Sequence, residues 1–432
     1  MRVTALDNSH ARARLFPQEP VQISALVLIY LALLCVSLVV VSEDVNPAFH
    51  IGYNRQFLTA ASISVAALGC CFQLFSIARF SFGYLVSFYM LSIVAGYLWL
   101  SFFTPLRYDL TIARWSAALS LIAFLIPAMF VTKAFTPRFK LTVRRVDQVV
   151  YGVLIVAALT VAYASSFDFH LIGFIEGEAL RSQFQYPAWL NYPIGASVSA
   201  ALPFSYAWAV HRRRYGLAAI ALAIGASFYP VTLNKLTLFA PLWLIGLTVL
   251  LKFFSVRLCV ILSLFIPLAL GLIIKTFDAS EVSLPFRLVN FRMIAIPASG
   301  LDHYNHFFSN HPLTHFCQIQ VIGRLFDCSL PSQLGVSLAA QYATGNYNAS
   351  LFASEGIASV GPYFAPIAAL LCGLVIAVGN KASAGLNHQF VFLSGSILAL
   401  VLMNVPLSTA MLSHGAVILF ALWFATPREE GL

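Results

Sequence analysis

The chain has 432 residues, of which 60% are hydrophobic, 14% aromatic and only 9% charged. Its mean hydropathy of +0.85 lies far outside the range of soluble globular domains, so the composition excludes an ordinary water-soluble fold and predicts a protein of the lipid bilayer. The formal net charge of +9 does not call for a nucleic-acid partner, because basic residues at the cytoplasmic ends of membrane helices account for it.

Apolar stretches long enough to cross the bilayer as helices recur along the whole chain. We expect an all-α polytopic membrane protein with about twelve transmembrane helices, at residues 21–42, 57–78, 82–103, 114–132, 149–166, 193–210, 216–231, 236–251, 257–275, 352–378, 389–406 and 409–425. The seventh and eighth are short and share the turn from Pro230 to Lys235, so a re-entrant hairpin is an alternative for this pair. One membrane domain is expected, with nine helices in residues 1–275, a large loop in 276–351 and three helices in 352–432.

The distribution of lysine and arginine predicts the orientation. With the N-terminus inside, sixteen of the twenty-five basic residues fall on the inner side with five acidic residues, and nine basic residues fall outside with eleven acidic residues. Since cytoplasmic loops collect lysine and arginine, both termini are expected in the cytoplasm and the large loop on the outer side of the membrane.

The large loop contains the histidine-rich stretch SGLDHYNHFFSNHPLTHF, from Ser299 to Phe316. A metal site is one interpretation, because the spacings of three and four residues could place histidine pairs on one helical face. Asn310 and Pro312 interrupt any continuous helix, however, so we expect no metal and no other cofactor. Structural roles and a direct part in substrate binding or proton transfer remain open for the four histidines, His303, His306, His311 and His315.

Two of the seven cysteines, Cys317 and Cys328, are the only ones expected outside the membrane. They lie eleven residues apart in the same loop, and an oxidising compartment would allow them to pair. A disulfide between them is therefore predicted, with two unpaired thiols as the alternative.

Arginine is disfavoured on the outer side of a membrane protein, yet several arginines are expected there. Each of them alone could be an interfacial anchor or a partner of a nearby acid. As a set they suggest a basic rim around an outward-facing cavity, since guanidinium groups bind phosphate oxygens with two parallel hydrogen bonds. The outer basic residues considered are Arg107, Arg114, Arg181, Arg287, Arg292, Arg324, Lys235 and Lys275.

The stretch GNYNASLFASEGIASVGPYFAPIAALLCGLVIA, which follows the loop, resembles the tail of Wzy-type O-antigen polymerases. The layout is similar as well, with about a dozen helices and the largest loop before the last three. At the residue level the resemblance covers about residues 275–380 and, more weakly, TLNKLTLFAPLWLIGL. The expected outer arginines Arg181 and Arg287 do not meet the pattern described for some members, an arginine followed after ten residues by a glycine, because they lie farther from Gly195 and Gly300.

This resemblance implies a fold like that of the C-type glycosyltransferases, a location in a bacterial inner membrane with the large loop in the periplasm, and a reaction on the periplasmic face. An undecaprenyl-diphosphate-linked glycan would be transferred to a sugar hydroxyl of another such repeat unit, with undecaprenyl diphosphate as leaving group and no nucleotide sugar. The family also implies a possible chain-length regulator protein as partner. Cations would have to meet the charge on the diphosphate, and a base would have to take the proton of the hydroxyl. The expected diphosphate-binding residues are Arg181, Lys235, Arg287, Arg292 and Arg324, and the expected catalytic residues are Asp302, His303, His306 and Glu355.

Three other classes stay open at this point. An O-antigen ligase would use the same donor with a different acceptor, which the sequence does not reveal. A transporter or flippase of lipid-linked sugars would be expected to show an internal repeat and ionisable or Gly/Pro-broken helices at mid-membrane. The expected spans contain Pro127, Pro203, Pro267 and Pro406, but no convincing repeat and no charged residue near the centre of any span. The third alternative is a non-enzymatic assembly protein or an acyltransferase, for which we find no supporting pattern.

Overall fold

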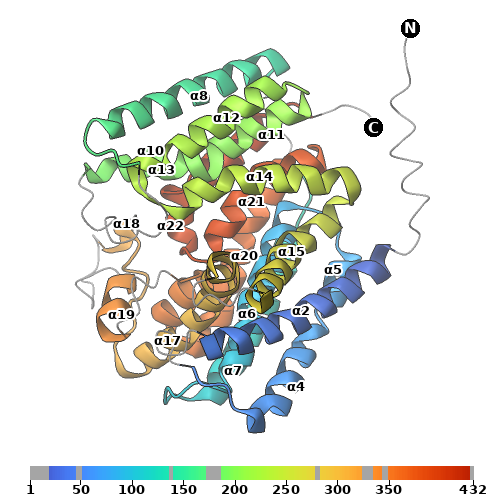
Figure 1. Ribbon diagram of the computed structural model, residues 1–432, viewed down its shortest axis with the longest axis vertical. Helices are drawn as coiled ribbons and strands as arrows, with labels where there is room; N and C mark the ends of the chain where they lie inside the picture. The colour runs from blue at the N-terminus through green and yellow to red at the C-terminus, as the bar shows by residue number, and fades with distance from the viewer. Residues whose placement is uncertain are drawn as a thin grey trace.

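A computed structural model describes residues 19–44, 51–135, 140–171, 186–277, 283–323, 334–342 and 349–428. Over these ranges the chain is helical and contains no strand, which confirms an all-α polytopic membrane protein. Figure 1 shows the helices packed as one bundle.

The helices follow one another in three groups along the chain. The first group comprises α2 (Glu19–Asp44), η1 (Arg55–Phe57), α4 (Leu58–Gly69), α5 (Phe72–Ile77), α6 (Phe82–Leu100), α7 (Leu110–Phe130) and α8 (Val143–Ser165). The second comprises η3 (Ala188–Leu190), α10 (Asn191–Ala196), η4 (Ser197–Ala201), α11 (Leu202–His211), α12 (Tyr215–Ser227), α13 (Tyr229–Thr232), α14 (Lys235–Phe253) and α15 (Val256–Phe277). The third comprises α16 (Leu284–Phe286), η5 (Arg287–Ala295), α17 (Ile296–Asn310), α18 (Gln320–Gly323), α19 (Leu334–Tyr342), η6 (Phe352–Ala358), α20 (Ser359–Ser383), α21 (His388–Leu402), α22 (Leu407–Leu412) and α23 (Ala416–Ala425).

Within the described ranges, nine helical segments are long and apolar enough to cross a bilayer. Each corresponds to one of the twelve predicted spans. They are Glu19–Asp44, Arg55–Ile77, Phe82–Leu100, Leu110–Phe130, Val143–Ser165, Tyr215–Thr232, Lys235–Phe253, Val256–Phe277 and Phe352–Ser383.

The three other predicted spans have irregular forms, so the number twelve stays a prediction. The span at 193–210 is a helix from α10 to α11 with a π-helical turn, η4, in its middle. The span at 389–406 is shorter than expected, since α21 ends at Leu402. The span at 409–425 is broken into α22 and α23, because the chain turns through the left-handed conformation at Gly415, with a φ of 72°.

Helix α6 is the axis of the bundle, and all nineteen of its residues are buried. Its sequence, FGYLVSFYMLSIVAGYLWL, is apolar on every side, as expected for a helix surrounded by other helices. Glycine allows a close approach to α17, since a Cβ added at Gly96 would lie 2.8 Å from the Cβ of Ala298. This contact seats α17 directly against the central helix.

Polar contacts join predicted outer helix ends to each other and predicted inner helix ends to each other. At the predicted outer ends, Lys275 of α15 forms an ion pair with Asp44 of α2 at 2.5 Å. At the predicted inner ends, the backbone N–H of Leu141 donates to the carbonyl of Ala425 at 2.9 Å. The side chain of Asn380 likewise donates to the carbonyl of Ala128 at 2.6 Å. These contacts agree with the order of crossing, while the assignment of one group to the periplasm stays a prediction.

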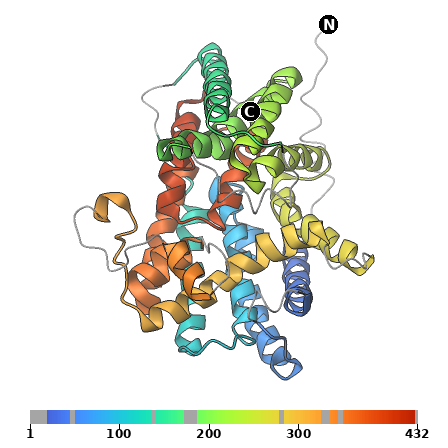
Figure 2. The same ribbon diagram turned by 60° about the vertical axis from the view of Figure 1, so that its left-hand side comes forward.

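Part of the large loop lies inside the protein. Its first part, 284–310, is continuously helical through α16, η5 and α17, and most of α17 is buried inside the protein. Figure 2 shows this segment crossing the molecule in gold and orange. The reason is packing, because the small residues of IPASG fit against α6 and bring the polar residues that follow into the interior.

Candidate functional site

The carboxylate of Asp302 is fully buried at the junction of α17 with the segment between α6 and α7. Thr104 donates a hydrogen bond from Oγ1 to Oδ2 at 2.7 Å, and the hydroxyl of Tyr108 donates to Oδ1. The hydroxyl of Tyr97 in turn lies 3.2 Å from that of Tyr108. Both oxygens of Asp302 are therefore occupied by neighbouring hydroxyl groups.

Burial dominates the ionisation of this group and raises the pKa of Asp302 to about 6. The hydrogen bonds from Tyr108 and Thr104 act in the opposite direction, because they favour the charged form. Burial also raises the pKa of Tyr108 well above its ordinary value, so its hydroxyl stays a donor. We call Asp302, Thr104, Tyr108 and Tyr97 the Asp302 centre.

Two histidines of α17 lie beside the Asp302 centre and contact Tyr342 at the end of α19. The Nδ1 atom of His306 is 2.6 Å from the Tyr342 hydroxyl, and the rings of His303 and Tyr342 meet edge to face at 4.7 Å. The ring of His306 also meets that of Tyr108 at 6.5 Å. The structure therefore brings together three of the four predicted catalytic residues, Asp302, His303 and His306.

Two of the four histidines have a ring nitrogen in contact with a backbone carbonyl. The Nδ1 atoms of His303 and His311 contact the carbonyls of Ser299 and Phe307, four residues earlier, at 2.8 and 2.9 Å. The helix ends at Asn310, as the sequence predicted, and the ring of His311 stacks on that of Phe307. In the part of the chain that the structure describes, no three His, Cys, Asp or Glu side chains form a group that could hold a metal ion.

Glu355 has a different environment from that of Asp302. It lies in η6, a π-helical turn at the head of the candidate span Phe352–Ser383, and is only 5% exposed. Ser408, at the start of α22, donates to its Oε1 twice, from the backbone N–H at 2.9 Å and from Oγ at 2.8 Å. The other oxygen, Oε2, is buried and accepts no hydrogen bond from the described residues. We call Glu355 and Ser408 the Glu355 centre.

The π-helical turn of η6 is held from outside by a segment of the large loop. Thr314 donates from its backbone N–H to the carbonyl of Ala358 at 2.8 Å. Gln318 donates from Nε2 to the hydroxyl of Ser359 at 2.7 Å and, more weakly, to the carbonyl of Ser354 at 3.3 Å. These bonds bracket Glu355, so the segment 314–318 fixes the backbone on both sides of it. Such π-helical turns occur frequently at functional sites.

The two carboxylates lie on different sides of α17. Tyr304 is hydrogen-bonded through its side chain to Ser354, the neighbour of Glu355. Tyr304 is two positions after Asp302, and two residues correspond to about 200° around an α-helix, so they point to nearly opposite faces. The structure thus separates the fourth predicted catalytic residue, Glu355, from the other three.

Arg287 and Arg292 are both exposed, as a role in binding an external ligand requires. An α-helix would place side chains five positions apart about 140° from each other. The segment is instead the π-helix η5, in which residues five apart are hydrogen-bonded neighbours along the axis. The two arginines are therefore closer to one face than the sequence suggested, and Arg292 is roughly 15 Å from Asp302 along the helix.

Of the remaining predicted residues, Lys235 lies on another helix. Lys235 begins α14, which packs against α12, α15 and α21, and its side chain is half-buried. Arg181 and Arg324 lie outside the described residues. Cys317 is disulfide-bonded, whereas its predicted partner Cys328 lies outside the described residues, so the pairing itself stays a prediction.

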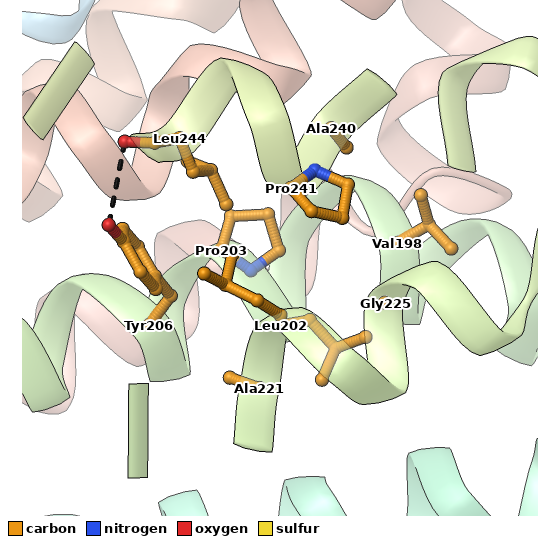
Figure 3. A pocket seen from close by; sticks show the side chains of 10 residues that line it. Val198, Leu202, Pro203, Tyr206, Ala221, Gly225, Ala240, Pro241 and Leu244 are labelled. Atoms are coloured by element: carbon orange, nitrogen blue, oxygen red, sulfur yellow. Dashed lines mark hydrogen bonds between the residues drawn. The ribbon is translucent and has the colours of Figure 1, made fainter. Parts of the chain in front are cut away.

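A small pocket lies elsewhere, between α11, α12 and α14 (Figure 3). Its lining is apolar and includes Pro203, Pro241 and Gly225. The single lining hydroxyl, that of Tyr206, already bonds Thr248 Oγ1 at 2.8 Å and approaches the carbonyl of Leu244. No group in this pocket can perform acid, base or nucleophilic chemistry, so the polar centres beside α17 are the better candidates.

Several residues that complete these centres were missed in the sequence. Thr104 and Tyr108 occur in a short loop, SFFTPLRYDL, and Ser408 occurs after Pro406 in an apolar stretch. Tyr304 and Tyr342 belong to the large loop, where aromatic residues are common. None of these positions forms a motif with the acidic residue that it contacts, because the contacts join segments far apart in the chain.

Comparison of the chain with protein-family models, with curated proteins and with solved structures gave no match. Function is therefore inferred from the sequence pattern, the side chains and their geometry.

Proposed function

We propose that this protein is a polytopic membrane glycosyltransferase that polymerises undecaprenyl-diphosphate-linked oligosaccharide repeat units on the periplasmic face of the inner membrane. The proposal is supported by the sequence resemblance over residues 275–380 and by the chemistry of the groups beside α17. Undecaprenyl diphosphate is the leaving group, and the product is a longer chain of repeat units, the precursor of a surface polysaccharide.

The observation that carries the proposal is the environment of Glu355. A carboxylate at the head of a membrane span is costly to bury without a partner, and such residues are usually functional. One oxygen is fixed by Ser408, and the other accepts no hydrogen bond from the described residues. This arrangement suits a general base, which needs a fixed orientation and one oxygen that is not already hydrogen-bonded.

In the proposed reaction Oε2 of Glu355 accepts the proton of the acceptor sugar hydroxyl. The hydroxyl oxygen attacks the anomeric carbon of the donor glycan and forms the new glycosidic bond. The bond between that carbon and the diphosphate oxygen breaks, and the electron pair leaves with undecaprenyl diphosphate. No redox step or cofactor is needed for this balance.

The negative charge on the departing diphosphate must be met by cations that are already in position. Arg287 and Arg292 support this role, because both are exposed and η5 places them toward one face of a helix that continues into α17. Their guanidinium groups match the geometry of phosphate oxygens. The chain-length regulator expected for such polymerases would be a separate partner.

The test is the pattern of surface polysaccharide in cells that lack this gene. We expect single repeat units on the carrier lipid and no ladder of longer chains, with the ladder restored by the wild-type gene. Complete absence of exported repeat units would instead indicate a flippase. Normal-length polymers that stay on undecaprenyl diphosphate and never reach their final acceptor would indicate a ligase.

A further inference from the structure

A cluster of five arginines, distant from the polar centres of α17, lies where the start of α8 meets the end of α11. We call it the arginine corner and define it as Arg144, Arg145, Arg212, Arg213 and Arg214. Figures 1 and 2 show α8, α11 and α12 together at one end of the molecule.

Asp147 of α8 joins the two sides of the corner. Its Oδ1 accepts a hydrogen bond from Trp208 Nε1 at 2.8 Å, and its Oδ2 pairs with Arg214 Nη1 at 3.1 Å. The corner and Asp147 together hold five arginines and one aspartate, which gives a net charge of +4. The four other arginines are exposed.

One arginine occupies a backbone position that favours glycine. Arg213 has a φ of 57°, in the left-handed region. Its N–H bonds the carbonyl of Val210 at 3.0 Å, and the N–H of Arg214 bonds that of Ala209 at 2.8 Å. These two bonds form a Schellman motif, in which the residue at the Arg213 position is usually glycine because a Cβ is strained there.

Two further arginines lie at the less favourable end of a helix. Arg144 and Arg145 are in the first turn of α8, where the helix dipole disfavours cations, and no acidic residue accompanies them in that turn. The general preference for cytoplasmic lysine and arginine does not explain these positions. A basic residue a few positions away would satisfy it without strain and without opposing the dipole.

The corner lies at the ends of two candidate spans, Val143–Ser165 and Tyr215–Thr232, where a bilayer changes from headgroups to hydrocarbon. Tyr215, directly after Arg214, is 66% exposed, and further along α8 Tyr151 and Ile155 are also exposed. Apolar side chains therefore adjoin the charges on the outer surface of the helices. A ligand that covers both must combine a negative headgroup with hydrocarbon chains.

We propose that the arginine corner binds the phosphate group of an anionic phospholipid of the surrounding leaflet. The guanidinium groups of both helices bind the phosphate oxygens, and the acyl chains lie along the exposed apolar face of α8. This inference is independent of the proposed glycosyl transfer, since it concerns the opposite helix ends from those near Glu355.

The test uses the full-length protein, purified in mild detergent and incubated with phosphatidylglycerol or phosphatidylcholine, with bound lipid counted by native mass spectrometry. We expect the wild type to retain phosphatidylglycerol preferentially. In the double variant Arg144→Gln and Arg213→Gln, the ratio of bound phosphatidylglycerol to bound phosphatidylcholine should fall about fivefold for each arginine removed. The matched control is Arg79→Gln with Lys252→Gln, which removes two exposed basic residues from the same predicted side. A preference that survives in the first variant, or that falls equally in the control, overturns the proposal.

A single substitution separates binding from folding. Arg213→Gly places the favoured residue in the Schellman motif, so the unfolding temperature should rise by a few degrees while phosphatidylglycerol retention falls. Unchanged retention in this variant would show that Arg213 does not contact the lipid. An excess of inorganic phosphate should leave the lipid bound, because the acyl chains contribute as well. Full displacement by inorganic phosphate would refute a lipid site and indicate a simple anion site.

Discussion

The Asp302 centre and the Glu355 centre are two buried carboxylates on opposite sides of α17, and they differ in how their oxygens are used. Asp302 accepts hydrogen bonds on both oxygens, from Tyr108 and Thr104, and so joins the segment between α6 and α7 to the large loop. Glu355 accepts two bonds on one oxygen and none from the described residues on the other. The two carboxylates are both buried, so the difference on which we assign the proposed base is the oxygen of Glu355 that has no donor among the described residues.

The largest expected effect is that of Glu355→Gln. The amide preserves the size and the acceptor for Ser408, but it cannot take a proton, so polymer growth should fall by at least about 100-fold, as for the loss of a general base. The measurement is the length distribution of the surface polysaccharide in cells that lack the wild-type gene. Membrane levels of the variant should be matched to the wild type by immunoblot.

Asp302→Asn is the matched control for this variant, because it makes the same chemical change in an equally buried carboxylate. We expect it to reduce polymer growth by less than about tenfold, since both hydrogen-bonded neighbours can still be satisfied by an amide. If Asp302→Asn abolishes the ladder and Glu355→Gln leaves it intact, the assignment of the two centres is reversed.

Ser408→Ala is expected to have a smaller effect, of roughly tenfold, because it removes one of the two hydrogen bonds to Oε1 and leaves the backbone N–H in place. Ser408→Thr keeps the hydroxyl and should restore most of the activity. Ser413→Ala removes a hydroxyl group near the other end of α22 without touching Glu355, so it serves as the control. Equal losses in Ser408→Ala and Ser413→Ala would mean that packing of α22, and not the bond to Glu355, determines the effect.

The two centres also differ in how far the sequence could predict them. Within the described residues, the nine candidate membrane spans could be predicted from hydropathy, since a helix satisfies the backbone hydrogen bonds of a long apolar run in lipid. Glu355 could be singled out because a charge at the head of a span is rare. Its partner Ser408 could not, because the contact joins residues 53 positions apart and depends on where α22 begins.

Irregular helices were the other feature beyond the reach of the sequence. Hydropathy does not distinguish an α-helix from a π-helix, so the turns η4, η5 and η6 were not expected. The burial of α17 was likewise not apparent from the sequence, because several of its residues are polar. Its small residues allow it to approach α6 closely, and tertiary packing then buries Asp302 and His303.

Ionisation of Asp302 should make the stability of the protein depend on pH. Burial raises the pKa of Asp302 to about 6, above its value in an unfolded chain, so the folded state binds the proton more tightly. The contribution of Asp302 to stability is therefore fully present below the unfolded pKa and is lost as the pH rises through about 6. The loss should reach about 3 kcal/mol at most, from a shift of about two pKa units.

Thermal unfolding of the purified protein from about pH 4 to about pH 7, followed by tryptophan fluorescence, measures this effect, because the window includes the ordinary and the raised pKa of the carboxyl group. Asp302→Asn should flatten the pH dependence in this window. Glu355→Gln changes a carboxylate on the other side of α17 and leaves Asp302 in place, so the part of the pH dependence that is due to Asp302 should remain. An unchanged slope in Asp302→Asn would contradict a proton held by Asp302.

The smallest expected effect concerns the contact between the Asp302 side of α17 and α19. Tyr342→Phe removes the hydroxyl group that lies 2.6 Å from Nδ1 of His306 but keeps the edge-to-face contact of the ring with His303. The loss of one neutral hydrogen bond corresponds to about 1 kcal/mol, or roughly a fivefold increase in local opening. Hydrogen exchange of residues 334–342 should therefore accelerate by about this factor, while exchange in the buried helix α6 stays unchanged. Tyr363→Phe is the control, because Tyr363 is 74% exposed and its loss of a hydroxyl should not alter exchange in α19. Faster exchange throughout the protein, in place of a change confined to α19, would mean that Tyr342 supports the whole fold and not only the docking of α19 onto α17.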